Sequence, residues 1–118
     1  MSQGSQSANG TPVTLVNVFE LPAQHVDAFI ARWRERAALM STQPGFVDTR
    51  LHRALSSQTR FQLVNVAHWD SAEAVQAAQA DPEFQQRVNA AIADPQVRFA
   101  AHPALYRVVA EVLRPDAR

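Results

Sequence analysis

The 118-residue sequence contains no cysteine, no lysine and only three glycines. The absence of cysteine excludes disulfides, thiolate nucleophiles, iron–sulfur clusters and cysteine-based zinc sites. There is no Gly-rich phosphate loop, and no apolar run approaches the roughly 20 residues of a membrane-spanning helix. The polar N-terminus lacks the basic start and apolar middle of a signal peptide. We therefore expect a cytoplasmic protein that does not insert into a membrane.

The charges of the chain balance, with 11 basic and 11 acidic residues. Such a chain has no broad electrostatic attraction for nucleic acid, so we expect no nucleic-acid partner. No pair of its four histidines has metal-ligand spacing on a helix, and we expect neither a metal nor a cofactor. Apolar residues make up 47% of the chain, enough for one core. We expect one domain at residues 12–113, between a disordered arm at 1–11 and a tail at 114–118.

The predicted elements follow the order β-α-β-β-α-β. β-branched and aromatic residues indicate strands, whereas apolar residues spaced three and four apart indicate helices. The predicted strands span residues 13–20, 46–54, 60–69 and 105–112, and the predicted helices span 23–41, 72–80 and 83–93. Short connections and right-handed crossovers then predict a ferredoxin-like α+β fold, in which a four-stranded antiparallel sheet carries its helices on one face.

The other face of the predicted sheet carries apolar side chains. Strand alternation places Val16 and Val18 of the first strand, and Val64 and Val66 of the third, on that face. Leaving a partly apolar sheet face in water is unfavourable. We therefore expect a homodimer in which two subunits pack sheet to sheet.

Asparagine occurs between apolar residues in two predicted strands. The sequence Leu-Val-Asn-Val occurs at 15–18 and at 63–66, with Asn17 and Asn65 in third place. Asparagine is unfavourable in strands, and an unpaired buried amide costs about 1–3 kcal/mol. Each amide could bond to backbone at a strand irregularity. However, ladder bonds occupy most backbone groups of central strands, which favours a pocket where the amides bind a ligand carbonyl, phenol or oxyanion.

Four short runs mark the chain, namely QPGF at 43–46, LVNVAHWDS at 63–71, DPEF at 81–84 and HPALYRVV at 102–109. Together they resemble the antibiotic biosynthesis monooxygenase domain family, whose members are dimeric α+β barrel proteins. The resemblance covers about residues 13–112 and implies that fold, with a pocket between the sheet and the helices. The superfamily includes cofactor-free oxygenases, haem-degrading enzymes, isomerases and cyclases, so the reaction must be argued from the site.

The resemblance also implies site residues. In the aromatic-polyketide monooxygenases of the family, an Asn on the third strand and the Trp four residues later line the pocket, and Asn65 and Trp69 match both. The helix phenol of those enzymes is replaced here by Val75. Their pocket arginine corresponds approximately to Arg87.

The haem-degrading relatives use an Asn on the first strand and the same Trp, which Asn17 and Trp69 match. They also use a histidine on the second helix as the iron ligand. The segment 83–92 contains no histidine, so haem binding in that manner is disfavoured.

Four further side chains are candidates for substrate contact. Trp33 and Phe29 lie on the apolar stripe of the predicted helix at 23–41 and form either core or pocket wall. Tyr106 is either a pocket phenol or a residue at the sheet edge. His52 is the candidate base among the histidines, because its strand pairs with the third strand.

These observations predict a cofactor-independent monooxygenase that uses O₂ to oxidise an electron-rich aromatic, such as a phenol, a hydroquinone or a polyketide-like anthrone. Asn65 would hold the oxyanion, while Trp69 and Trp33 would shape an apolar slot. Two alternatives remain open. One is an isomerase or cyclase that uses the same pocket for proton transfer, and the other is a non-catalytic protein that binds a small ligand.

Overall fold

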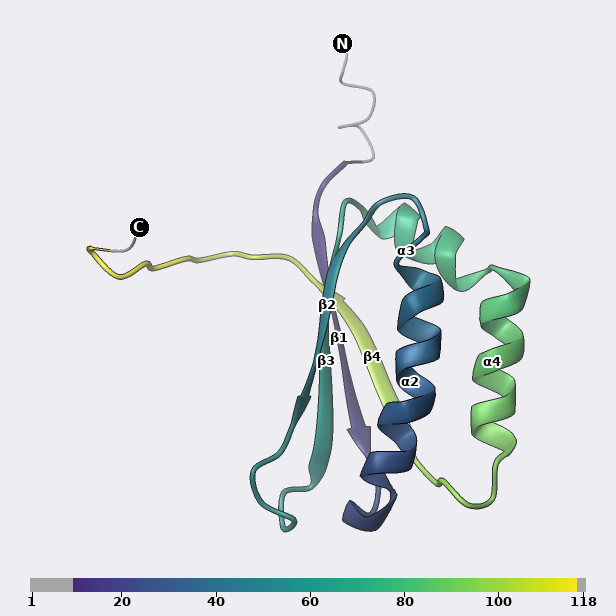
Figure 1. The fold of residues 1–118 in the computed structure, drawn as a ribbon. Coiled ribbons are helices and arrows are strands. Elements are labelled where there is room, and N and C mark those ends of the chain that lie inside the picture. The colour runs from purple at the N-terminus through teal and green to yellow at the C-terminus, as the bar shows by residue number, and fades with distance from the viewer. Residues whose placement is uncertain (1–9, 117–118) are drawn as a thin grey trace.

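Four antiparallel strands form one sheet in the order β2-β3-β1-β4 in the computed structural model, which describes residues 10–116 (Figure 1). The strands are β1 (Val13–Glu20), β2 (Phe46–Arg53), β3 (Phe61–Trp69) and β4 (Ala100–Tyr106). The helical elements are η1 (Ala23–His25), α2 (Val26–Met40), α3 (Ala72–Gln79) and α4 (Pro82–Ala93). The helices lie on one side of the sheet. The predicted ferredoxin-like α+β architecture is confirmed. The arm predicted at 1–11 lies almost entirely outside the described residues.

Local sequence signals explain where α3 and α4 begin. The Ser71 hydroxyl accepts a hydrogen bond from the Ala74 N–H at 3.1 Å, and the Asp81 carboxylate accepts one from the Phe84 N–H at 3.0 Å. Each cap satisfies a donor that the first helical turn leaves unpaired. Pro82 then occupies the first turn of α4, where its missing N–H costs nothing. The break between α3 and α4 lets α4 return alongside α2 (Figure 1).

The last strand differs from its prediction. β4 pairs with β1 from Ala100, opposite Glu20, to Tyr106, opposite Thr14. Pro103 is tolerated because β4 lies at the sheet edge. The valine-rich residues 107–112 continue beyond the part of β1 that β4 pairs with, and they leave the domain on the side away from the helices (Figure 1). The strand predicted at 105–112 is therefore wrong beyond Tyr106, because a strand also needs a neighbour to pair with.

Apolar side chains between the sheet and the helices form two clusters. The first contains Phe19, Leu21, Val26, Phe29, Leu63 and Val97. The second contains Ala67, Trp69, Val75 and Ala78. Members of both clusters also line the cavity described below. The cavity therefore lies within the apolar interior of the domain.

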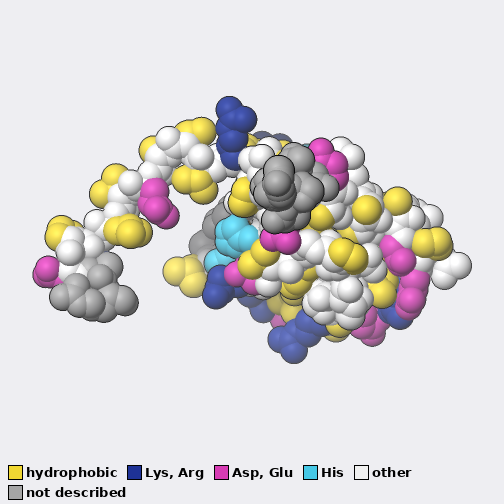
Figure 2. Space-filling view, turned by 90° about the horizontal axis from the view of Figure 1, so that it is seen from above, with side chains coloured by type: hydrophobic (Ala, Val, Ile, Leu, Met, Phe, Trp, Pro, Cys, Tyr) yellow, Lys and Arg dark blue, Asp and Glu magenta, His cyan; other side chains and the backbone are white. Residues whose placement is uncertain are grey.

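The face of the sheet without helices, called here the uncovered face, has a different character. Val16 pairs with Val66, and Val18 pairs with Val64, at its centre. Strand register places three histidines on the same face, His52 on β2, His68 on β3 and His102 on β4. Figure 2 shows histidine side chains on the side of the domain from which the C-terminal segment departs. The two faces of one sheet thus carry different chemistry.

Candidate functional site

A cavity of about 330 Å³ lies between the sheet and the helices. This volume is at the lower end of the range of about 300–1,000 Å³ that is usual for ligand pockets. Most of the wall is apolar, and its larger apolar side chains are Leu15, Phe19, Trp33, Met40, Phe46, Trp69, Val75, Phe84, Val88 and Phe99. The size and lining suit a small, largely apolar ligand.

Two carboxamides line this cavity from the sheet. Asn17 of β1 and Asn65 of β3 lie directly opposite one another on neighbouring strands, and both side chains lie on the helix side. The Thr49 hydroxyl, also in the cavity wall, donates a hydrogen bond of 2.5 Å to Asn65 Oδ1. This bond turns Oδ1 toward Thr49, and Nδ2, which carries both donors of the amide, is the group of Asn65 that can donate to a ligand. Thr49 therefore orients the amide, a role that the sequence did not indicate.

Two polar atoms in the cavity wall are buried without a hydrogen-bond partner among residues 10–116. They are the acceptor Asn17 Oδ1 and the donor Trp69 Nε1. Leaving a buried polar group unpaired costs about 1–3 kcal/mol. Folded proteins satisfy most such groups, so exceptions in a cavity mark positions where a ligand can bind. A ligand with one donor and one acceptor would satisfy both atoms.

The two tryptophans line the cavity from different layers, Trp33 from α2 and Trp69 from β3. Trp69, at the end of β3, is only 3% exposed and packs edge-on against Phe46 with ring centroids 5.3 Å apart. Trp33 reaches the cavity from α2. Trp69 therefore serves in the core and in the cavity wall at once.

Arg36 is a cavity residue that the sequence interpretation missed. It follows Trp33 by three positions on α2 and lies at the border of the apolar stripe, which is the signal that could have revealed it. Its guanidinium carbon lies 5.4 Å from the centroid of the Phe29 ring. Burial lowers the pKa of Arg36, the neighbouring positive charge of Arg32 lowers it further, and the Glu35 carboxylate opposes this shift. Among the described residues, none of the side chains that line the cavity is acidic.

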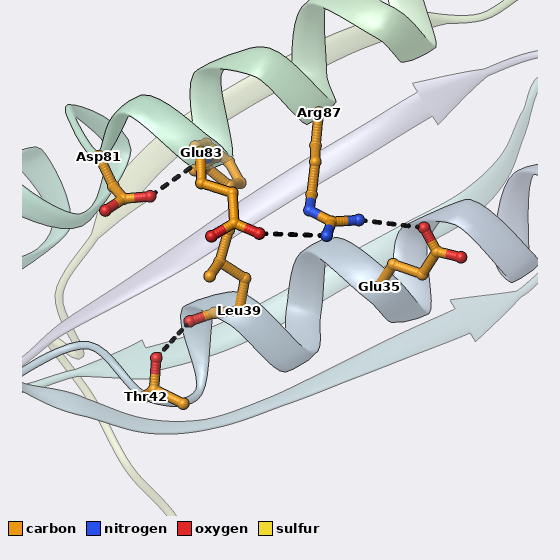
Figure 3. Close-up of polar contacts among 7 residues, drawn as sticks. Glu35, Leu39, Thr42, Asp81, Glu83 and Arg87 are labelled. Carbon is orange, nitrogen blue, oxygen red and sulfur yellow. Dashed lines mark hydrogen bonds and ion pairs between the residues drawn. The ribbon is translucent and has the colours of Figure 1, made fainter.

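Arg87, the predicted pocket arginine, lies elsewhere. Figure 3 shows its guanidinium between two carboxylates, at 3.1 Å from Glu83 and 3.2 Å from Glu35. These ion pairs join α4 to α2, and Arg87 is absent from the cavity wall. Its charge is thus paired outside this cavity, and substrate contact by Arg87 stays a prediction that the cavity lining does not support.

Three further candidates also lie outside the cavity. Phe29 is buried in the core, with its ring centroid 4.7 Å from that of Phe19, and supports the cavity from behind its wall. His52 is exposed on the uncovered face, where its Nδ1 lies 3.3 Å from the Val64 carbonyl oxygen. Tyr106 ends β4 opposite Thr14 and is 55% exposed. Strand alternation directs His52 and Tyr106 away from the helices. Tyr106 therefore lies at the sheet edge, the second of its two expected positions, and substrate contact by either residue stays a prediction.

This sheet, its one-sided helices and its internal apolar cavity define an α+β domain of the ferredoxin-like class. The family model described as antibiotic biosynthesis monooxygenase matches residues 12–90. The chain belongs to this family.

Individual relatives agree with this assignment. A provisionally assigned monooxygenase from Shewanella loihica PV-4 is 34% identical, with a TM-score of 0.68, and the match covers 86% of this chain and 97% of that one. SnoaB, a cofactor-independent oxygenase from Streptomyces nogalater, is 26% identical with a TM-score of 0.69, covering 90% and 99%. The heme oxygenase (mycobilin-producing) of Mycobacterium tuberculosis is 35% identical over 66 residues, which span 56% of this chain and 61% of that protein.

The haem chemistry of the mycobacterial relative provides a test of fit. Among residues 10–116, no histidine lines the cavity, and α4 contains none. The described residues also contain no group of three or more His, Cys, Asp or Glu that could hold a metal ion. The residues present therefore do not fit a histidine-ligated haem. A separate search of the described residues finds no helix long and apolar enough to cross a membrane.

Proposed function

We propose that this protein is a cofactor-independent monooxygenase whose substrate is a phenolic aromatic of the hydroquinone or anthrone type. The observation that carries the proposal is the pair of buried, unpartnered atoms in an apolar cavity, Asn17 Oδ1 and Trp69 Nε1. A phenol or hydroquinone supplies a flat apolar ring, a donor for the first atom and an acceptor for the second. The similarity to SnoaB supports the same reaction class.

The proposed reaction uses the substrate as the electron donor. Its phenolate, held by Asn65 Nδ2, transfers electrons to O₂, and a C–O bond forms at a ring carbon that bears hydrogen. The peroxide anion takes up one proton from water, which replaces the proton that the phenol lost, and the O–O bond of the resulting hydroperoxide then breaks as the ring C–H proton is lost. The ring carbon becomes a carbonyl, and the second oxygen atom leaves as water. The apolar wall strengthens the hydrogen bond that holds the negative charge.

The lining of the cavity supports this proposal over an isomerase or cyclase. Enzymatic proton transfer commonly uses a His, Asp or Glu within hydrogen-bond reach of the substrate. None of these residue types lines the cavity among the described residues. An oxygenase that acts on an acidic phenol needs no strong base of its own. The pH dependence of kcat/KM should therefore follow the pKa of the substrate phenol.

The direct test is oxygen uptake with dithranol, an anthrone, and with 1,4-naphthohydroquinone, each corrected for uptake without enzyme. We expect Asn65→Ala to lower kcat about 10²–10³-fold, as for removal of one oxyanion donor. Val64→Ala, its neighbour on the uncovered face, serves as the matched control and should retain wild-type kcat. Binding of 1-naphthol without oxygen uptake from any substrate would instead assign the chain as a non-catalytic binding protein.

The expected homodimer forms the second part of the proposal. The uncovered face presents Val16, Val18, Val64 and Val66, and the C-terminal segment that leaves on the same side exposes Val108, Val109, Val112 and Leu113. Pairing two uncovered faces would remove this apolar surface from water. The cytoplasmic location also stays a prediction.

A further inference from the structure

Among the described residues, one charged side chain lines the cavity, and it is positive. Arg36 lines the cavity from α2, whereas the amides Asn17 and Asn65 line it from the sheet. Among residues 10–116, Arg36 forms no ion pair with a carboxylate. Arg36 is half-buried, and the neighbouring Glu35 carboxylate offsets only part of its loss of hydration, because the direct ion pair of Glu35 is with Arg87.

Two acids close to α2 already have partners. Glu35, the residue before Arg36, lies 3.2 Å from Arg87. Asp94, after α4, lies 2.7 Å from Arg32. The positive charge of Arg36 is instead supported by the face of the Phe29 ring, within the range of about 6 Å for a cation–π contact. The Phe29 ring therefore helps to hold the guanidinium at the cavity while leaving its N–H donors to another partner.

We infer that Arg36 binds an anionic group of the substrate, so that the preferred substrate is an aromatic carrying a carboxylate as well as a phenolic hydroxyl. The planar fork of a guanidinium matches a carboxylate with two parallel hydrogen bonds. The carboxylate would lie at the α2 wall and the hydroxyl at the sheet wall, beside Asn17 and Asn65. This inference deepens the proposed function and rests on it for the identity of the ring and hydroxyl.

The inference is tested with two probes, 6-hydroxy-2-naphthoate and 2-naphthol, which differ only in the carboxylate of the first. Binding is measured by quenching of tryptophan fluorescence and by calorimetry. We expect the wild-type protein to bind the naphthoate about 10–100-fold more tightly than the naphthol, which corresponds to one charge-assisted contact. Arg36→Gln should abolish this preference and leave naphthol affinity within about twofold. Arg36→Lys, which keeps the charge but loses the fork, should retain part of it.

Arg34→Gln is the matched control, because Arg34 lies on the same helix, is exposed and does not line the cavity. It should leave both affinities unchanged, and thermal melting of each variant verifies folding. Equal binding of the two probes by the wild-type protein, absence of saturable naphthoate binding, or a preference that survives in Arg36→Gln would overturn the inference. Neither probe needs to be oxidised, so this outcome is independent of the oxygen-uptake test of the proposed function.

Discussion

The two faces of the sheet use the same strands for different purposes. On the helix side, β1 and β3 combine buried apolar residues with Asn17 and Asn65 at the cavity. On the uncovered side, the same strands present valines at the centre. Alternation makes this separation possible, since neighbouring residues point to opposite faces. The comparison teaches that the cavity and the proposed dimer surface can be altered separately by changing adjacent residues.

The largest effect is expected from the adjacent pair Leu63 and Val64. Leu63 is fully buried on the helix side, so Leu63→Ala should lower the free energy of unfolding by about 2–5 kcal/mol through lost burial and a new cavity. In the monomer, Val64→Ala should lower the free energy of unfolding by well under half as much as Leu63→Ala. Chemical denaturation at low protein concentration measures both. Equal losses would mean that the two faces do not differ in burial.

The next largest effect is expected at Asn17, where one substitution should change stability and ligand binding in opposite directions. Asn17→Leu replaces a buried, unpaired acceptor with an apolar side chain of similar size, and should maintain or raise the free energy of unfolding by about 1 kcal/mol. The same change should weaken binding of 2-naphthol about tenfold, because the ligand hydroxyl loses its acceptor. Thermal melting and calorimetry give the two values. A destabilised variant with unchanged affinity would show that Asn17 is a structural residue.

The uncovered face provides a test of assembly. Val66→Asp places a charge at the centre of the proposed interface, opposite Val16, and should convert a species of twice 13.0 kDa into one of 13.0 kDa. Removal of residues 107–118 should weaken the dimer by a smaller amount. Light scattering coupled to gel filtration measures the mass. A wild-type protein that is monomeric at micromolar concentration would contradict the proposed dimer.

The smallest effect concerns acid stability on the uncovered face. A hydrogen bond of 2.6 Å between His68 Nδ1 and Asp48 Oδ1 lowers the pKa of Asp48, with desolvation opposing it. Because the folded pKa lies below the ordinary value of 3.8, the stabilisation is present above that pH and is lost as the pH falls through the lower folded value. Asp48→Asn should therefore flatten the decline in stability below about pH 4, as measured by urea denaturation across pH. An unchanged decline in Asp48→Asn would show that the His68–Asp48 pair does not contribute to stability in acid.

Much of the fold followed from local patterns. Period-two alternation placed Asn17, Asn65 and Trp69 on one face, and caps and prolines placed the boundaries of α3 and α4. The last strand was predicted wrongly beyond Tyr106, because the valines that follow have high strand propensity but no neighbouring strand within residues 10–116. Pairing depends on tertiary arrangement, which propensity does not describe.

The site was harder to predict than the fold. His52 was assigned without knowledge of the β2–β3 register, which directs it to the uncovered face. Arg87 was assigned by approximate correspondence, and its ion pairs with Glu35 and Glu83 involve two helices far apart in sequence. Arg36 and Thr49 were missed because their significance depends on what surrounds them. Whether a side chain has a hydrogen-bond or ion-pair partner is decided by the folded chain, so the sequence alone does not reveal it.

The most direct measurement of the central claim is the ¹⁵N–¹H spectrum of the indole groups during titration with 2-naphthol. The chain contains two tryptophans, and Trp33→Phe assigns the signal of Trp69. We predict that the Trp69 Nε1–H resonance moves downfield and saturates as its proton gains an acceptor, while the ring signals of His52 and His68 stay fixed. Saturable binding that leaves the Trp69 signal in place, or that moves the histidine signals instead, would contradict the assignment of this cavity as the substrate site.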